Sequence, residues 1–169
     1  MRTRHLFLAT LLSFFAIATP VLAQQFPTIA SKDLNERAVT LPQDFAANRS
    51  LLFIAFEQEQ QTDVNTWLPF AEQLEQNGQA KFYELPVLPS ALRLAGGFIQ
   101  NGMRSGIPSQ ATRAKTITLY TNVSRFRANL GLGPTNQIYA VVIDRTGKVL
   151  AVESGAYSEA KAQKLRAAL

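Results

Sequence analysis

Cysteine is absent from this chain, and histidine occurs once, as His5. His5 lies in an N-terminal segment that we expect to be removed, so residues 24–169 offer no thiolate, no imidazole base and no metal site with sulfur or imidazole ligands. Disulfide exchange is excluded for the same reason. The sequence also contains no phosphate-binding loop and no dinucleotide fingerprint, so it predicts no cofactor.

The N-terminus has the layout of a secretory signal. Arg2 and Arg4 precede an apolar run over residues 6–17, and Val21-Leu22-Ala23 ends the segment with small residues. We expect cleavage near Ala23, which releases residues 24–169 as a periplasmic or secreted protein. A retained membrane anchor is the alternative, although the apolar run is shorter than the about 20 residues of a spanning helix.

Residues 24–169 correspond to a single domain, with no internal repeat and no linker. A chain of this size buries about 68 to 70% of its unfolded surface, and a core of that extent stabilises the fold without disulfides. Since exported domains often depend on disulfides, this one must depend on its core.

Charge is distributed unevenly along the chain. Residues 24–84 hold nine acids and four bases, whereas residues 85–143 hold six bases and no acid. The six are Arg93, Arg104, Arg113, Lys115, Arg125 and Arg127. A basic region of this kind favours an anionic membrane surface or an acidic patch on a protein partner. A solvated face without a partner is the alternative, because the charges are dispersed. Nucleic acid is not expected as a partner, since no dense basic and aromatic stripe is present.

Hydrophobic periodicity predicts alternating strands and helices. The predicted elements are strand 51–56, helix 64–76, strand 81–85, a helix with its apolar face across 88–103, strand 116–120, helix 123–130, strand 137–143, strand 148–152 and a terminal helix after Ser158. Asp63 is placed to cap the first helix, and Asp144-Arg145-Thr146-Gly147 is typical of a tight turn. This order predicts an α/β sandwich of three layers, with a mixed central sheet, a late β-hairpin and a C-terminal helix.

Three acids, Glu57, Glu59 and Asp63, lie in the loop between the first predicted strand and helix. Carboxylates can act as general bases or bind Ca²⁺ and Mg²⁺. The spacing matches no calcium loop, so we predict no metal site, and a solvated polar loop is the simpler interpretation.

Other side chains suggest binding rather than catalysis. Arg104 and Arg113 flank Pro108 and could clamp an anionic ligand through bidentate hydrogen bonds. Trp67 could stack on a ligand, but its helical spacing from neighbouring apolar residues favours a place in the core. No serine has a histidine to activate it, and we predict no catalytic residue.

The layout resembles the thioredoxin-like superfamily, in particular the branch of alkyl hydroperoxide reductase and thiol-specific antioxidant proteins. The resemblance rests on the strand 51–56, on Trp67-Leu68-Pro69-Phe70, on the segment 117–122 and on the hairpin 142–149. A weaker similarity links the chain to factors that assist assembly of the ATP synthase membrane sector, which share a Trp-containing helix and the late hairpin. That similarity implies a chaperone or assembly role.

In catalytic members of the superfamily, the redox cysteine lies at the start of the first helix, after the first buried strand. Two registers are open here. The spacing Thr62-x-x-Asn65 is similar to a peroxidatic Thr-x-x-Cys pattern with Asn in place of Cys, whereas alignment through Pro69 puts Gln61 and Val64 at the thiol positions. Neither register supplies a nucleophile. Pro134 is a candidate for the superfamily's cis-proline.

These observations predict an exported, redox-inactive thioredoxin-like protein that binds an envelope protein partner as a binding, chaperone or assembly module. Its binding surface is expected at the degenerate active-site loop. The predicted residues are Glu57, Gln61, Thr62, Asp63, Asn65 and Trp67, with partner or anion contacts from Arg104 and Arg113. The alternative is a cysteine-independent periplasmic enzyme, in which Glu57 or Asp63 acts as acid or base on a small anionic substrate.

Overall fold

The computed structural model describes residues 24–169. The expected signal segment, residues 1–23, lies outside this part of the chain, and so does its alternative as a membrane anchor. Within residues 24–169, every helix is too short or too polar to span a bilayer.

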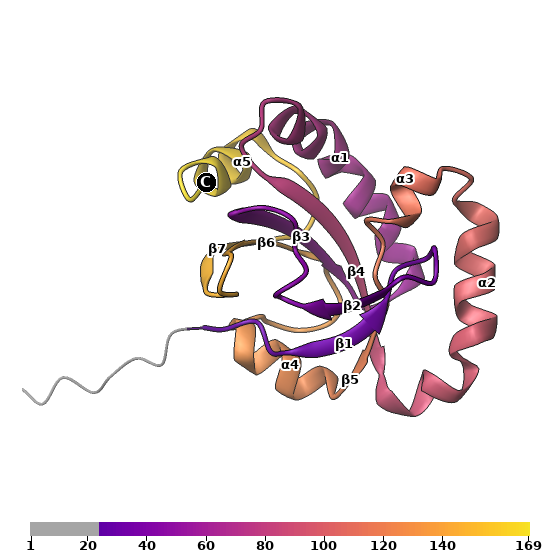
Figure 1. Cartoon of the computed structure of the whole chain (residues 1–169). Helices are drawn as coiled ribbons and strands as arrows, with labels where there is room; N and C mark the ends of the chain where they lie inside the picture. The colour runs from indigo at the N-terminus through magenta and orange to yellow at the C-terminus, as the bar shows by residue number, and fades with distance from the viewer. Residues whose placement is uncertain (1–23) are drawn as a thin grey trace, which may run out of the picture.

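A five-stranded mixed sheet forms the centre of the molecule, in the order β5-β4-β3-β6-β7 (Figure 1). The strands are β3 (Arg49–Ala55), β4 (Lys81–Pro89), β5 (Leu119–Thr121), β6 (Tyr139–Asp144) and β7 (Val149–Ser154). β3 pairs with β4 in parallel and with β6 antiparallel. β3 is therefore the central strand, which accounts for its continuous apolar run.

Helices and a small second sheet cover the two faces of the central sheet. One face packs against α1 (Gln61–Gln76) and α5 (Glu159–Arg166) through a core that includes Phe53, Trp67 and Leu165. The other face packs against α4 (Val123–Leu130) and an antiparallel pair, β1 (Ile29–Lys32) and β2 (Ala38–Leu41). The predicted three-layer α/β sandwich is confirmed, as are the hairpin of β6 with β7 and the terminal helix.

β4 runs four residues further than predicted, to Pro89. Its prolines fit because the pairing of β4 with β3 ends at Pro86. Residues up to Pro86 pair with β3, and pairing with β5 begins at Val87. A proline lacks the N–H of a ladder hydrogen bond, and it is tolerated where a pairing ends. The predicted helix over 88–103 therefore begins later, as a 3₁₀ turn η2 (Ser90–Ala95) followed by α2 (Gly96–Gly106), and a short α3 (Gln110–Arg113) follows.

The start of α1 also differs from the prediction. The helix begins at Gln61 after a 3₁₀ turn η1 (Gln58–Gln60), and its N-cap residue Gln60 makes no side-chain cap. Asp63 lies in the first turn and is not the cap, although a carboxylate there still interacts favourably with the helix dipole. The cap at the other end of the chain is as predicted: the Ser158 hydroxyl accepts a hydrogen bond from the Lys161 N–H of α5.

Candidate functional site

The structure places residues 61–65 at the junction between the central strand and the first long helix. β3 ends at Ala55, the chain passes through η1, and α1 begins at Gln61. This is the position at which the sequence resemblance puts the redox cysteine of catalytic members. Gln61 occupies the first helical residue, whereas Val64 is buried in the core under α1.

Gln60 fixes the loop that leads into the helix. Its side chain is buried, its Oε1 accepts a hydrogen bond of 2.8 Å from the Phe56 N–H, and its Nε2 donates one of 2.6 Å to the Thr135 carbonyl oxygen. The amide thus ties the junction to the segment that precedes β6. Sequence reasoning missed this residue, because a glutamine in a polar loop carries no signal of burial.

Gln61 lies over a buried carboxyl group. Its Nε2 donates to Glu84 Oε2 at 2.9 Å and to Asn65 Oδ1 at 3.0 Å. Glu84 belongs to β4 and is only 8% exposed. Burial raises the pKa of the Glu84 carboxyl, while the hydrogen bond from Gln61 and the charge of Lys115 act in the opposite direction. The sequence signal for Glu84 was a lone acid in the apolar strand 82–85, and it was overlooked.

The remaining predicted residues of the loop divide into a surface group and a core residue. Glu57, Gln61, Thr62 and Asn65 are exposed, and Asp63 is half-buried. Within residues 24–169, neither Glu57 nor Asp63 forms an ion pair. These five residues form what we call the junction surface.

The Trp67 side chain is fully buried, as its helical spacing predicts, so a ligand cannot reach it. Its Nε1 donates to the Gly155 carbonyl oxygen at 3.0 Å, and its ring meets Tyr157 edge to face with centroids 5.2 Å apart. The tryptophan therefore links α1 to the segment between β7 and α5. Its contribution is to the core and not to the junction surface.

The two arginines predicted as an anion clamp have separate partners. Arg104 of α2 pairs with Glu36 at 3.5 Å, and Arg113 of α3 donates to the Pro108 carbonyl oxygen at 2.7 Å. Among residues 24–169, no ion pair links either guanidinium to Glu57 or Asp63.

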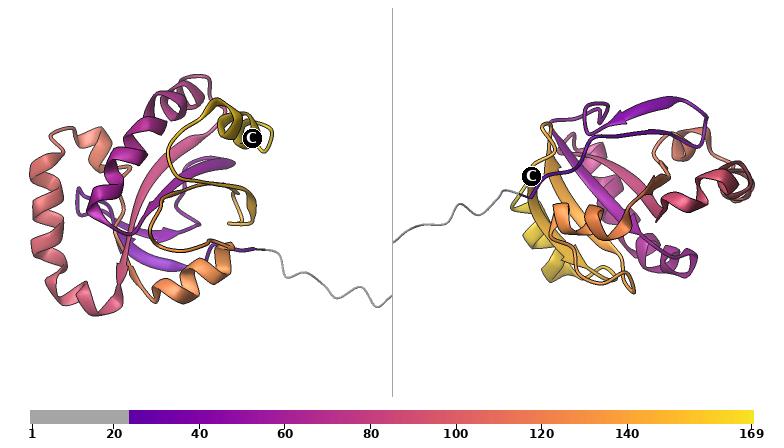
Figure 2. Two further views of the ribbon diagram at one scale, coloured as in Figure 1. Left: turned by 180° about the vertical axis from the view of Figure 1, so that it is seen from behind. Right: turned by 90° about the horizontal axis from the view of Figure 1, so that it is seen from below.

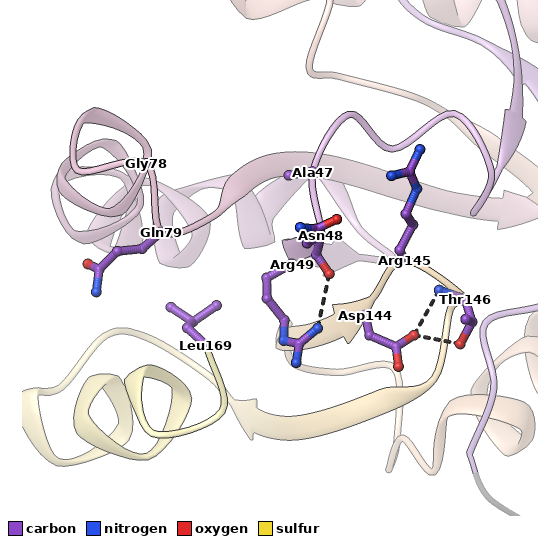
Figure 3. A pocket seen from close by; sticks show the side chains of 9 residues that line it. All are labelled: Ala47, Asn48, Arg49, Gly78, Gln79, Asp144, Arg145, Thr146 and Leu169. Carbon is purple, nitrogen blue, oxygen red and sulfur yellow. Dashed lines mark hydrogen bonds between the residues drawn. The ribbon is translucent and has the colours of Figure 1, made fainter.

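A hollow of about 580 Å³ lies at the other end of the central strand. Its lining residues are Ala47, Asn48, Arg49, Gly78, Gln79, Asp144, Arg145, Thr146 and Leu169 (Figure 3). Arg49 is the first residue of β3, whereas the junction surface follows the last, Ala55. In Figure 3 Arg49 Nη1 donates to the Asn48 carbonyl oxygen and Asp144 accepts from Thr146. Arg49 Nε is buried without a hydrogen-bond partner.

The proline suggested as the superfamily's cis-proline follows a trans bond. Among residues 24–169, the cis peptide bond is Leu41–Pro42. The Pro134 carbonyl oxygen accepts a hydrogen bond of 2.8 Å from the Tyr139 hydroxyl, so the segment before β6 is held by the first residue of that strand.

Within residues 24–169, no three acidic or imidazole side chains gather closely enough to hold a metal ion.

No family model matches the chain, and no curated protein matches its sequence. Solved structures do match it. A protein of Aquifex aeolicus named for electron transfer has a TM-score of 0.61 at 12% identity, over 88% of this chain and 98% of that one. The exposed lipoprotein thioredoxin Etrx1 of Streptococcus pneumoniae has a TM-score of 0.54 at 12% identity, over 85% of this chain and 100% of that one.

A third similar structure is BsSco, a member of the Sco family of cytochrome c oxidase assembly proteins. Its TM-score is 0.57 at 11% identity, over 87% of this chain and 94% of that one. At such identities the likeness concerns the fold alone. The chain therefore has the thioredoxin-like fold, and because it contains no cysteine it cannot carry out the thiol redox chemistry of that fold.

Proposed function

We propose that this thioredoxin-like chain is an exported, redox-inactive module that binds an envelope protein partner through the junction surface. The proposal rests on the side chains at Gln61 and Val64, the two positions that align with the redox cysteines when the alignment is made through Pro69. Gln61 is hydrogen-bonded to Glu84 and Asn65, and Val64 is packed in the core. The Gln61 and Val64 side chains stabilise this part of the loop and helix, and neither is a nucleophile.

The anchoring of the loop supports a binding role. Gln60 holds the loop to Phe56 and Thr135, so the junction surface is ordered before any partner arrives. Association costs less conformational entropy when the contact residues are already fixed. The exposed groups are amide, hydroxyl and carboxylate, which suits a polar contact on a partner protein.

The finer assignments of the sequence resemblance belong to the same proposal. We place the chain with the alkyl hydroperoxide reductase and thiol-specific antioxidant branch, and we give it a chaperone or assembly role. BsSco is a member of a family of assembly proteins, and it has the same fold. The shared fold supports an assembly role by analogy only, and it does not identify a partner.

Site-specific photo-crosslinking in the cell envelope tests the proposal. A photoreactive residue at Thr62 is expected to give a discrete adduct with one envelope protein, whereas the same residue at Gln73, an exposed position further along α1, is expected to give none. Equal labelling from both positions, or no adduct from position 62, contradicts the proposal.

Matched charge variants then measure the contact. Asn65→Lys and Gln73→Lys place the same charge on exposed positions of α1, one at the junction surface and one away from it. Asn65→Lys is expected to weaken binding of the identified partner about tenfold or more, because the added charge loses its hydration at the contact. Gln73→Lys is expected to bind normally. Turnover of a small anionic substrate that is lost in Glu57→Ala or Asp63→Ala would support the enzyme alternative instead.

A further inference from the structure

Large apolar side chains are exposed at one place in residues 24–169. Leu92 is 42% exposed, Leu94 is 100% exposed and Phe98 is 86% exposed, and these are the large hydrophobic residues that the described part of the chain leaves on its surface. All three fall within seven consecutive positions. Together we call them the apolar ridge. Single exposed leucines need no explanation, but a cluster on one segment indicates an interaction site.

The apolar ridge lies on an element that nothing else covers. Leu92 and Leu94 belong to η2, and Phe98 belongs to α2. Figure 1 and both views of Figure 2 show α2 at the edge of the molecule, with no other element on its outer side. Leu94 and Phe98 are four positions apart, about one helical turn, so they project on the same side of this segment.

The inner side of the same segment is attached to the central sheet. Arg93 Nη2 donates to the Tyr120 carbonyl oxygen at 2.9 Å, and Thr118 Oγ1 contacts Met103 Sδ at 3.6 Å. Gly96 allows the Tyr120 ring to approach closely, since a Cβ there would lie 3.2 Å from the Tyr120 hydroxyl oxygen. The segment is therefore held in place, and the apolar ridge is presented to the outside by a fixed support.

The charge around the apolar ridge is positive. Arg93 lies between Leu92 and Leu94 on η2, and Arg104 lies on α2. Arg104 pairs with Glu36, which also pairs with Lys32. Glu36 therefore faces two bases. Residues 85–143 themselves contain no acid at all.

We propose that the apolar ridge docks this protein on an anionic lipid bilayer. Leu94 and Phe98 enter the boundary between headgroups and acyl chains. The positive charges of Arg93 and Arg104 attract the lipid phosphates, although both guanidinium groups also have partners within the chain. Leucine and phenylalanine beside basic residues are typical of segments that bind in the membrane interface. The segment 85–143, which holds six bases and no acid, complements the negative potential of such a surface.

The size of the apolar ridge favours a bilayer over a second copy of the chain or another protein. A standard protein interface uses about 20 to 30 residues a side, whereas the apolar ridge supplies three large apolar side chains. A bilayer can accept a few apolar side chains without a complementary surface of its own. The apolar ridge and the junction surface belong to different elements, so this inference does not depend on the envelope partner proposed above.

The absence of cysteine makes a direct test practicable. A single cysteine at Phe98, labelled with an environment-sensitive fluorophore, reports the polarity at the apolar ridge in the full chain. A single cysteine at Gln163, exposed on α5, is the control, since α5 lies on the opposite side of the molecule from α2 in Figure 1. Vesicles of phosphatidylcholine with phosphatidylglycerol are expected to shift the fluorescence from position 98 to the blue and to leave position 163 unchanged. Added salt is expected to reduce the effect.

Vesicle sedimentation of unlabelled variants measures how strongly each one binds the bilayer. Leu94→Ser and Phe98→Ser are each expected to weaken binding about tenfold, while Gln163→Ser has no effect. Each variant differs from the parent chain at one position only, so a change in sedimentation is due to that side chain. Both ridge positions are exposed, and circular dichroism checks that the variants fold.

Three results would overturn the proposal. The first is an unshifted probe at position 98 in the presence of vesicles. The second is serine variants that sediment with vesicles as strongly as the parent chain, and the third is a probe that shifts with protein concentration in the absence of lipid. The last result would assign the apolar ridge to a contact between copies of the chain.

Discussion

The side-chain amide of Gln61 donates a hydrogen bond of 2.9 Å to Oε2 of Glu84, which joins the first residue of α1 to the middle of β4. The two residues are 23 positions apart, and they meet because β3 and β4 run in parallel beneath the helix. A buried carboxyl group therefore lies directly below the position that a redox cysteine occupies in catalytic members of the resembled superfamily.

Glu84 makes stability depend on pH. Because burial raises its pKa above the usual value of 4.5, the folded protein binds the proton more tightly than the unfolded chain. The stabilising contribution is complete below the unfolded pKa and is lost as pH rises through the folded pKa. Glu84→Gln keeps an acceptor for Gln61 and cannot ionise, so it is expected to raise the free energy of unfolding at pH 8 by about 1 kcal/mol.

Urea unfolding from pH 4 to pH 8 measures this effect. The Glu84→Gln variant is expected to lose less stability across that range than the parent chain. Glu57→Gln, an exposed matched substitution, is expected to change stability by less than about 0.5 kcal/mol. An unchanged pH profile in Glu84→Gln would show that Glu84 is not the group responsible.

A cysteine introduced at position 61 reports the same carboxyl group. In Gln61→Cys the helix N-terminus lowers the pKa of the new thiol, whereas the neighbouring Glu84 carboxylate raises it. Adding Glu84→Gln to Gln61→Cys is therefore expected to increase the rate of alkylation by iodoacetamide at pH 7 about threefold or more. The control is Thr62→Cys. Among the described residues no hydrogen bond joins Thr62 to Glu84, so Glu84→Gln is expected to leave the alkylation rate of this variant unchanged.

Trp67 is expected to be among the most costly residues to truncate. Its ring is fully buried, and its Nε1 satisfies the Gly155 carbonyl oxygen. Trp67→Ala is expected to lower the free energy of unfolding by about 3 to 5 kcal/mol, and Trp67→Phe by about 1 to 3 kcal/mol, because the phenyl ring fills most of the space but leaves the carbonyl unpaired. Urea unfolding followed by circular dichroism provides the measurement, with Gln73→Ala as the surface control. A loss below about 1 kcal/mol in Trp67→Ala would contradict the packing described.

Gly96 and Tyr120 are expected to show energetic coupling. A Cβ at position 96 would lie 3.2 Å from the Tyr120 hydroxyl oxygen, which is buried without a hydrogen-bond partner. Gly96→Ala is expected to destabilise the protein by about 1 kcal/mol, and Tyr120→Phe is expected to be neutral or stabilising. In the double variant part of the cost of Gly96→Ala is expected to disappear, because the hydroxyl oxygen is removed while the ring carbon at 3.3 Å remains. Thermal unfolding of the four proteins gives the coupling free energy, and strict additivity would show that the tyrosine does not limit the space at Gly96.

Much of the architecture could be predicted because it follows from local patterns. The apolar run at 51–56 identifies a strand buried on both faces, and the helical spacing around Trp67 places that residue in the core. The prediction of β4 was wrong where the strands that pair with it begin and end. β4 continues through Pro86 to Pro89 because it exchanges β3 for β5 there, and no local pattern records that exchange.

The strand-to-helix junction was predicted, but the contacts that organise it were not. The order of the predicted strand and helix placed residues 61–65 at this junction, and in the structure α1 begins at Gln61 after β3. The two groups that organise the junction, Gln60 and Glu84, were both missed. Gln60 meets Thr135 across 75 positions, and such a contact depends on the order of strands in the sheet.

The amino-acid sequence by itself determined which chemistry this protein lacks, because residue types alone decide whether a thiol or an imidazole exists. It also determined the types of its main elements, since periodicity acts over a few residues. Only the tertiary structure decided that Glu84 lies under Gln61 and that Leu94 and Phe98 stay outside the core. Burial and long-range pairing are properties of the packed sheet, in which each strand acquires its neighbours from distant parts of the chain.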